Sequence, residues 1–241
     1  MDEEEFLFPR NSVLGMQAEA CFEAYLKNSA HYKLLAANLQ VYTSVSSKNG
    51  TAKETIGELD YIVKKHALKA VVHVELACKF YLYDMDAGAL ETEKWIGPNR
   101  KDRLFDKLEK VKLKQFPLLH KNETIEKLKA LNIEIPTLQE LCLKAFLFLP
   151  KEMKTQAIAR NYANCVVGYW IKHQDLIKEE ADALYAIPSK KKWLLPLANI
   201  EAWYSFSEIK KMIDTQVENR KSPLIYKKTS FKTERFFVVW W

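Results

Sequence analysis

The chain has 241 residues, of which 48% are hydrophobic and 28% are charged, the composition of a globular protein large enough to bury a substantial core. No apolar run is long and uncharged enough to span a bilayer, and the first ten residues, MDEEEFLFPR, lack the positive charge of a signal peptide. We therefore expect a cytoplasmic protein with no membrane partner. The four cysteines lie far apart without a CxxC pair, which favours free thiols; they are Cys21, Cys78, Cys142 and Cys165.

Charge is divided unevenly along the chain. Residues 1–92 hold 9 Lys and Arg against 13 Asp and Glu, a net charge of −4, whereas residues 93–241 hold 28 against 18, a net charge of +10. An acidic half followed by a basic half suits a cation held beside a polyanion such as nucleic acid. The competing interpretation is that these charges lie on solvated faces.

A helix followed by three strands is predicted for the first third of the chain. Apolar residues at approximately helical spacing predict a helix within residues 12–39. Runs rich in β-branched and aromatic residues, separated by turn-forming segments, predict strands over residues 39–45, 56–63 and 70–84.

The third of these strands has the strongest pattern. Its even positions, from Ala70 to Leu82, are all non-polar, while its odd positions include His73, Glu75 and Lys79. Glu75 and Lys79 are four residues apart, a spacing that would also support a helix surface. The strict alternation and the abundance of valine and aromatic residues favour the strand.

A hairpin between the second and third strands would bring carboxylates together. A turn centred on the His-Ala pair places Asp60 opposite His73 and Glu58 opposite Glu75, and a slip of two residues keeps the same face. Like charges that face each other in a sheet are destabilising. A positive group is therefore needed between them, either a lysine from the same strand face or a divalent metal ion.

The rest of the chain continues as a mixture of helices and strands. A basic amphipathic helix is predicted after Gly97 and Pro98, within residues 95–116. Further helices are predicted for residues 122–132 and 205–219, and further strands for residues 144–150, 165–171, 191–196 and 235–241. We find no internal repeat or linker, so we expect a single domain over residues 1–241, with a core at 11–150 and a C-terminal α+β elaboration at 151–241.

The order of these elements and of their acidic residues resembles the core of the PD-(D/E)XK nuclease superfamily. The resemblance implies an α/β protein with a restriction-endonuclease-like core, in which helices flank a four-stranded mixed sheet. It further implies that Asp60 and Glu75 are catalytic residues that bind Mg²⁺ or Mn²⁺. It implies that Glu19, in the first helix, is an additional catalytic metal ligand, and that Lys79 is the lysine that assists the attacking water. Such a site is physically sound, because Mg²⁺ is typically held by one or two carboxylates plus waters.

Three segments, GELD, HVELACKFYL and WIGPNRKDRL, are similar to a bacterial family called domain of unknown function 1853, which is grouped with that superfamily. One departure matters, because the superfamily usually has its lysine two residues after the acid, where this chain has Ala77. Lys79 lies four residues after Glu75, roughly 13 Å along an ideal strand. A β-bulge or the long side chain would have to bring the ammonium group back. Otherwise the site is reduced to metal binding, or the fold has lost its activity.

We therefore expect a metal-dependent nuclease, or a related nucleic-acid-processing protein, that hydrolyses phosphodiester bonds. The candidate phosphate contacts are Arg100, Lys101 and Arg103, which could equally form a solvated helix start. DNA is favoured over RNA as the nucleic acid, and a homodimer is a possible assembly. The alternative is a non-catalytic nucleic-acid-binding or assembly protein that retains the nuclease-like fold.

A purely structural interpretation of the same residues also stands. In that interpretation Asp60 and Glu75 form an ion-pair cluster with Lys79, while Glu19 is an ordinary residue of a helix surface. His73 is interpreted as a core or hydrogen-bonding histidine in preference to a metal ligand.

Overall fold

The computed structural model describes residues 13–47, 50–176 and 183–241. The chain divides into two compact units, each built from separated segments. Unit A consists of residues 18–77 and 107–144, and unit B of the described residues among 1–17, 78–106 and 145–241. Two long strands, β3 (Ala70–Tyr83) and β5 (Leu138–Pro150), each contribute residues to both units.

The other strands are β1 (Tyr32–Ser47), β2 (Gly50–Lys65), β4 (Trp95–Ile96), β6 (Val166–Lys172), β7 (Leu184–Ala186), β8 (Leu224–Lys228) and β9 (Thr233–Val239). The described strands pair in the order β1-β2-β3-β5-β6-β9-β8-β7, with β4 paired to β3, which makes nine strands. The β5–β6 and β6–β9 pairs are parallel and the β1–β2, β2–β3 and β8–β9 pairs are antiparallel.

The prediction of a mixed α/β architecture is thus confirmed, whereas the prediction of four strands is wrong. The strands that the sequence did not indicate are short: β4 has two residues, β7 has three, and β8 ends in two lysines. Two or three residues are too few for an alternating pattern to be recognised, and the five residues of β8, LIYKK, do not alternate. The strand predicted over residues 191–196 is also wrong, because the chain forms a 3₁₀ turn, η4, at Lys190–Lys192.

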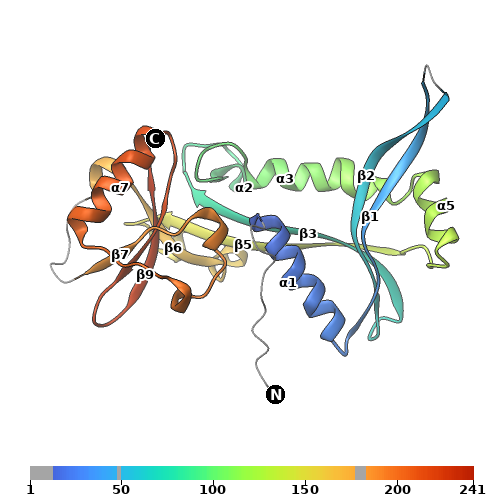
Figure 1. Cartoon of the computed structure of the whole chain (residues 1–241), viewed down its shortest axis with the longest axis horizontal. Coiled ribbons are helices and arrows are strands. Elements are labelled where there is room, and N and C mark those ends of the chain that lie inside the picture. Colours follow the sequence, from blue (N-terminus) through green and yellow to red (C-terminus); the bar gives the residue numbers. More distant parts are fainter. Residues whose placement is uncertain (1–12, 48–49, 177–182) are drawn as a thin grey trace. The chain divides into compact units, whose positions relative to one another are not determined.

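Unit A contains a long hairpin of β1 and β2 (Figure 1). Helix α1 (Leu14–Asn28) ends at Asn28, so the prediction of a helix that continues towards residue 39 is wrong. Instead, β1 pairs with β2 from Tyr32 opposite Lys65 to the far end of both strands. The hydrogen bonds of this ladder and the burial of Val41 outweigh the helical spacing of the segment.

The two faces of the unit A sheet are covered by different helices. On one face, Leu26 of α1 packs with Tyr61 and Val72. On the other face, Leu118 and Leu128 pack with the strand residues. These come from a helical run made of α3 (Leu104–Lys110), a π-helical turn η1 (Val111–Gln115) and α4 (Phe116–Leu118), and from α5 (Asn122–Ala130), which lies beside β1 in Figure 1. No helix among the described residues combines the length and the apolar character needed to cross a membrane.

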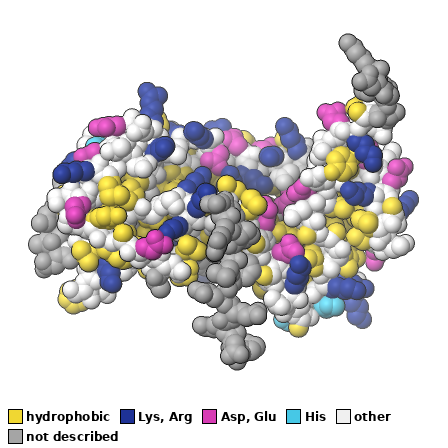
Figure 2. Space-filling view, in the orientation of Figure 1, with side chains coloured by type: hydrophobic (Ala, Val, Ile, Leu, Met, Phe, Trp, Pro, Cys, Tyr) yellow, Lys and Arg dark blue, Asp and Glu magenta, His cyan; other side chains and the backbone are white. Residues whose placement is uncertain are grey.

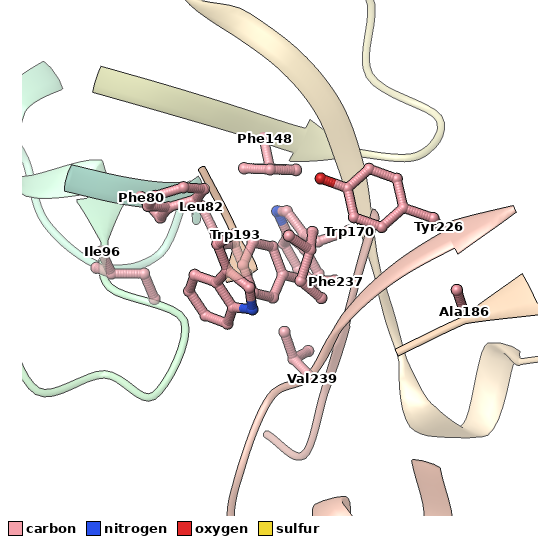
Figure 3. Packing of buried hydrophobic residues seen from close by; sticks show 11 residues of the cluster. Phe80, Leu82, Ile96, Phe148, Trp170, Ala186, Trp193, Tyr226, Phe237 and Val239 are labelled. Atoms are coloured by element: carbon pink, nitrogen blue, oxygen red, sulfur yellow. The ribbon is translucent and has the colours of Figure 1, made fainter. Parts of the chain in front are cut away.

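Unit B has an aromatic core (Figure 3). Phe80 of β3, Phe148 of β5 and Phe237 of β9 meet there, with Trp170 and Trp193 beside them. Helix α7 (Phe206–Glu218) lies within the helix predicted over 205–219, and its N-cap is Ser205, whose side chain pairs with Glu208 in a capping box. The remaining short elements are α2 (Glu91–Lys94), η2 (Thr155–Ala157), α6 (Arg160–Ala163), η3 (His173–Asp175) and η5 (Leu197–Asn199).

Gly168 on β6 allows two strands and an aromatic ring to approach each other. A Cβ atom at this position would lie 2.1 Å from the carbonyl oxygen of Arg235 and 2.9 Å from the Phe148 ring. We expect Gly168→Ala to lower the free energy of unfolding by about 2–3 kcal/mol, because a backbone carbonyl cannot move aside without distorting β9. Chemical denaturation measures the loss. Gly15→Ala in α1, where a Cβ meets nothing within 4 Å, is the control and should be neutral or slightly stabilising.

Candidate functional site

The β2–β3 hairpin sets the position of the acidic residues. Ile62 lies opposite His73 and Tyr61 opposite Val74, so the predicted register, with Asp60 opposite His73, is wrong by two residues. The reason is the turn, which spans residues 66–69 and therefore has its centre one residue later than predicted. The same strand face is kept, but Asp60, and not Glu58, now comes next to Glu75.

Asp60 and Glu75 form a close carboxyl pair in unit A. The backbone N–H of Leu76 donates a hydrogen bond to Asp60 Oδ2 at 2.8 Å. The pKa of Asp60 is raised to about 6, first by burial and then by the negative charge of Glu75 and a hydrogen bond between the two carboxyl groups. The Leu76 N–H and the positive charge of Lys107 act in the opposite direction and lower this pKa. The two acidic groups therefore repel each other in a partly buried place.

Glu75 is completely buried, and both of its carboxylate oxygens have hydrogen-bond partners. His73 Nε2 lies 2.9 Å from Glu75 Oε1, and the Gln115 side-chain amide donates to Oε2. The Gln139 amide nitrogen lies 3.1 Å from His73 Nδ1. Because an amide NH₂ group can only donate, His73 Nδ1 accepts this bond, and the ring proton on Nε2 is free to donate to Glu75. This pattern fits a neutral histidine that orients Glu75.

The positive charge at this site comes from Lys107 in α3. Its ammonium group donates to the Gln115 side-chain oxygen at 2.9 Å, and its charge acts on Asp60. Gln115 thus touches the lysine through its oxygen and Glu75 through its nitrogen. Lys107, Gln115 and Gln139 are not among the site residues predicted from the sequence. The helical spacing in the sequence could have indicated two of them. Lys107 and Gln115 lie four residues before and four residues after the buried Val111, so the three residues share one side of a helix.

The structure places the other two predicted acid–base residues elsewhere. Lys79 belongs to unit B, where its ammonium donates to Asp102 at 2.7 Å. Glu19 is an exposed residue of α1, and its backbone carbonyl accepts a hydrogen bond from the Tyr61 hydroxyl at 3.1 Å. Within the described part of the chain, no group of three or more His, Cys, Asp or Glu residues is arranged to hold a metal ion. The structure brings together Asp60 and Glu75, and it does not add Glu19 to them.

The three predicted phosphate contacts line one small pocket of unit B. The pocket has a volume of about 250 Å³, and its lining is Ala87, Ile96, Arg100, Lys101, Asp102, Arg103 and Asp106. Arg100 donates to Asp84 at 3.0 Å, and Arg103 donates twice to Asp106, each time at 3.1 Å. Lys101 is exposed. Two of the three cations are therefore already paired with carboxylates on the surface.

The whole chain was compared with known protein families, curated proteins and solved structures. A family model described as Domain of unknown function (DUF1853) matches residues 4–239. The chain belongs to the DUF1853 family. Comparison with curated proteins gave no match, and neither did comparison with solved structures. Family membership thus agrees with the similarity of the three sequence segments.

The raised pKa of Asp60 predicts an unusual pH dependence of stability. Asp60 is protonated more readily in the folded chain than in the unfolded chain, where its pKa is about 3.9. Between these two pKa values the native state binds more protons than the unfolded state. Protonation of Asp60 therefore stabilises the fold at low pH, and this contribution to the free energy of unfolding is lost as the pH rises through about 6. In EDTA at pH 8, Asp60→Asn should raise the free energy of unfolding by about 1–2 kcal/mol, a value discounted for the partial exposure of the group.

Urea denaturation of wild type and Asp60→Asn over a series of pH values measures this effect. The difference in the free energy of unfolding between Asp60→Asn and wild type should become smaller as the pH falls through 6 and disappear below about 4. A variant that is less stable than wild type at every pH would show that Asp60 is a favourable structural partner and not one of two repelling charges.

Proposed function

We propose that this protein is a metal-dependent phosphodiesterase acting on nucleic acid, with Asp60 and Glu75 as ligands of Mg²⁺ or Mn²⁺. The observation that carries the proposal is the meeting of two carboxyl groups next to one lysine, with the pKa of Asp60 raised to about 6. A carboxyl group whose pKa is raised by burial together with a specific charged neighbour is a candidate for a functional site. The similarity to the PD-(D/E)XK superfamily supports the same proposal.

The donor set fits a hard divalent cation. Mg²⁺ binds carboxylate oxygens and commonly uses one or two of them, with waters and substrate phosphates completing its coordination. A cation between Asp60 and Glu75 would replace their repulsion by attraction. When bound, such an ion supplies positive charge for the developing negative charge on phosphorus oxygens and acidifies the attacking water. Among the described residues no group of three or more His, Cys, Asp or Glu could hold a metal ion, so this proposal needs a cation such as Mg²⁺, for which one or two carboxylates are enough.

Each protein group then has a definite task in hydrolysis. Asp60 and Glu75 would hold the cation, and His73 with Gln115 fixes the orientation of Glu75. In the reaction, the oxygen of water forms a bond to phosphorus and the ester P–O bond breaks. A proton of the water is lost, and the leaving oxygen gains one. Lys107 is placed to stabilise the negative charge of the transition state, the role that the sequence analysis assigned to Lys79.

Nucleic acid is the substrate class that the charge distribution favours. Residues 93–241 carry the net charge of +10, and on the face shown in Figure 2 the Lys and Arg side chains are interspersed with Asp and Glu. Binding therefore depends on local groups such as the pocket of Arg100, Lys101 and Arg103. DNA is proposed over RNA from the superfamily resemblance alone.

If these three residues contact phosphates, the affinity for duplex DNA should fall steeply with salt. Each neutralised phosphate contributes about 0.9 to the slope of log affinity against log salt. Changing all three residues to Ala should therefore reduce that slope by about 2–3, as measured by fluorescence anisotropy. The control removes the same charge from three exposed lysines, Lys129, Lys154 and Lys211. Equal slopes in the two triple variants would exclude the pocket as the phosphate contact.

A second candidate, a nucleic-acid-binding protein without turnover, rests on one specific observation. Glu75 is fully buried with both oxygens hydrogen-bonded, as a structural carboxylate would be. Incubation of the purified chain with labelled single- and double-stranded DNA and RNA, with Mg²⁺ or with EDTA, separates the two. Cleavage that requires Mg²⁺ and is lost in Glu75→Gln supports the phosphodiesterase. Binding without cleavage under every condition supports the second candidate.

A further inference from the structure

We infer that Gln115 is the positioning residue of this site, and that the π-helical turn η1 exists to deliver it. The inference rests on the proposed function at one point only, namely that Glu75 and Lys107 act together on a metal ion and its substrate. It assigns to Gln115 no contact with substrate. Its role is to hold the carboxylate and the ammonium group in a fixed relation.

The side-chain amide of Gln115 contacts both Glu75 and Lys107. Its nitrogen donates to Glu75 Oε2, and its oxygen accepts from Lys107 Nζ at 2.9 Å. One planar group therefore links the buried acid of β3 with the lysine of α3. A side-chain amide can donate to a carboxylate and accept from an ammonium group at the same time. Glutamate could serve the lysine but not the acid, and leucine could serve neither.

The backbone around Gln115 departs from a regular α-helix. The backbone N–H of Phe116 bonds to the carbonyl of Val111, the five-residue spacing of a π turn, and ordinary α-helix surrounds this turn on both sides. Pro117 follows at once, and a proline ring clashes with the carbonyl four residues earlier, which a wider turn relieves. The π turn shifts the helical phase relative to a regular α-helix, in which each residue corresponds to a rotation of about 100°. Without this turn, the Gln115 side chain would point away from Glu75. π turns inside helices often occur at functional positions.

The Glu75 carboxylate that Gln115 contacts is buried. Glu75 and His73 have no exposed surface, so in the metal-free protein Glu75 depends on its protein hydrogen-bond partners. A buried carboxylate that loses a hydrogen bond is less firmly held, and the position of Glu75 is then set by its remaining partners, His73 and Asp60. Loss of Gln115 should therefore displace Glu75 and remove one hydrogen-bond partner of Lys107, without removing either residue.

The test compares Gln115→Leu with Thr124→Val, a matched control in the same unit. Thr124 is also buried and loses one side-chain hydrogen bond, from its hydroxyl to the Leu118 carbonyl at 2.7 Å, but it has no part in the site. In cleavage assays over a range of Mg²⁺ concentrations, Gln115→Leu should raise the half-saturating Mg²⁺ concentration roughly 10–100-fold, the usual effect of losing a group that orients a ligand. Thr124→Val should lower the melting temperature and leave that concentration unchanged. An equal, small change in both variants would overturn the inference.

A second measurement does not depend on activity. In EDTA, the melting temperatures of Gln115→Leu, Lys107→Met and the double variant form a double-mutant cycle. If Gln115 bridges to Lys107, the double variant should lose clearly less than the sum of the two single losses. Additive losses would overturn the inference even where the wild type cleaves nucleic acid. A wild type that cleaves nothing but shows the coupling would defeat the proposed function and leave the bridge by Gln115 standing.

Discussion

Asp60→Asn should abolish Mg²⁺-dependent cleavage while leaving the protein folded and, at pH 8, more stable than wild type. Asparagine keeps the size of the side chain and an oxygen that can accept from the Leu76 N–H, but it removes the negative charge that would attract the cation. The expected loss in turnover is on the order of 100-fold or more, because metal binding contributes several kcal/mol to the stabilisation of the transition state. Single-turnover cleavage at saturating Mg²⁺ measures it.

This combination of lost activity and gained stability is what distinguishes a functional carboxylate from a structural one. Functional groups are often kept at the expense of stability, since the arrangement that binds the ligand is strained without it. A structural Asp60 would give the opposite result, with reduced stability and near-normal activity. That pairing of results would remove Asp60 from the site.

Lys107→Met is the second substitution with a large expected effect. It keeps most of the hydrophobic stem and deletes the charge that acts on Asp60. We expect the cleavage rate at saturating Mg²⁺ to fall on the order of 100-fold, whereas metal affinity should change little, because lysine is not a ligand. The pKa of Asp60 should rise further, since Lys107 lowers it. Metal-dependent rate measurements and carboxyl NMR titration test the two parts separately.

Lys79→Met is the substitution to compare with Lys107→Met. The sequence prediction makes Lys79 the catalytic lysine, while the structure pairs it with Asp102 and places Lys107 at the acidic residues. The account based on the structure expects a normal cleavage rate in Lys79→Met and a strongly reduced rate in Lys107→Met. The reverse order would return the role to Lys79 and contradict our assignment of Lys107.

The part of the site that lies on one strand could be predicted from the sequence. The alternation along β3 determined that His73 and Glu75 share a face, and a slip of two residues does not change that face. The partner of Glu75 could not be fixed in the same way, because the register depends on the turn. A turn centred one residue later exchanged Glu58 for Asp60.

The residues that arrive from another element were out of reach of periodicity. Lys107 and Gln115 approach β3 only through the packing of a helical run, and the π turn changes the helical phase between them and the residues that follow. No single-residue propensity indicates such a turn, apart from the proline that comes after it. The lysine of the site therefore came from a helix, although the sequence pattern pointed to the strand.

The most direct test of the central claim is a calorimetric titration of metal-free protein with Mn²⁺ or Mg²⁺ at pH 7.5. The wild type and the Asp60→Asn/Glu75→Gln double variant are compared, with circular dichroism to establish that both are folded. The account predicts saturable binding at a single site in the wild type, accompanied by a higher melting temperature, and neither effect in the double variant. Identical titrations and thermal shifts in the two proteins would contradict it.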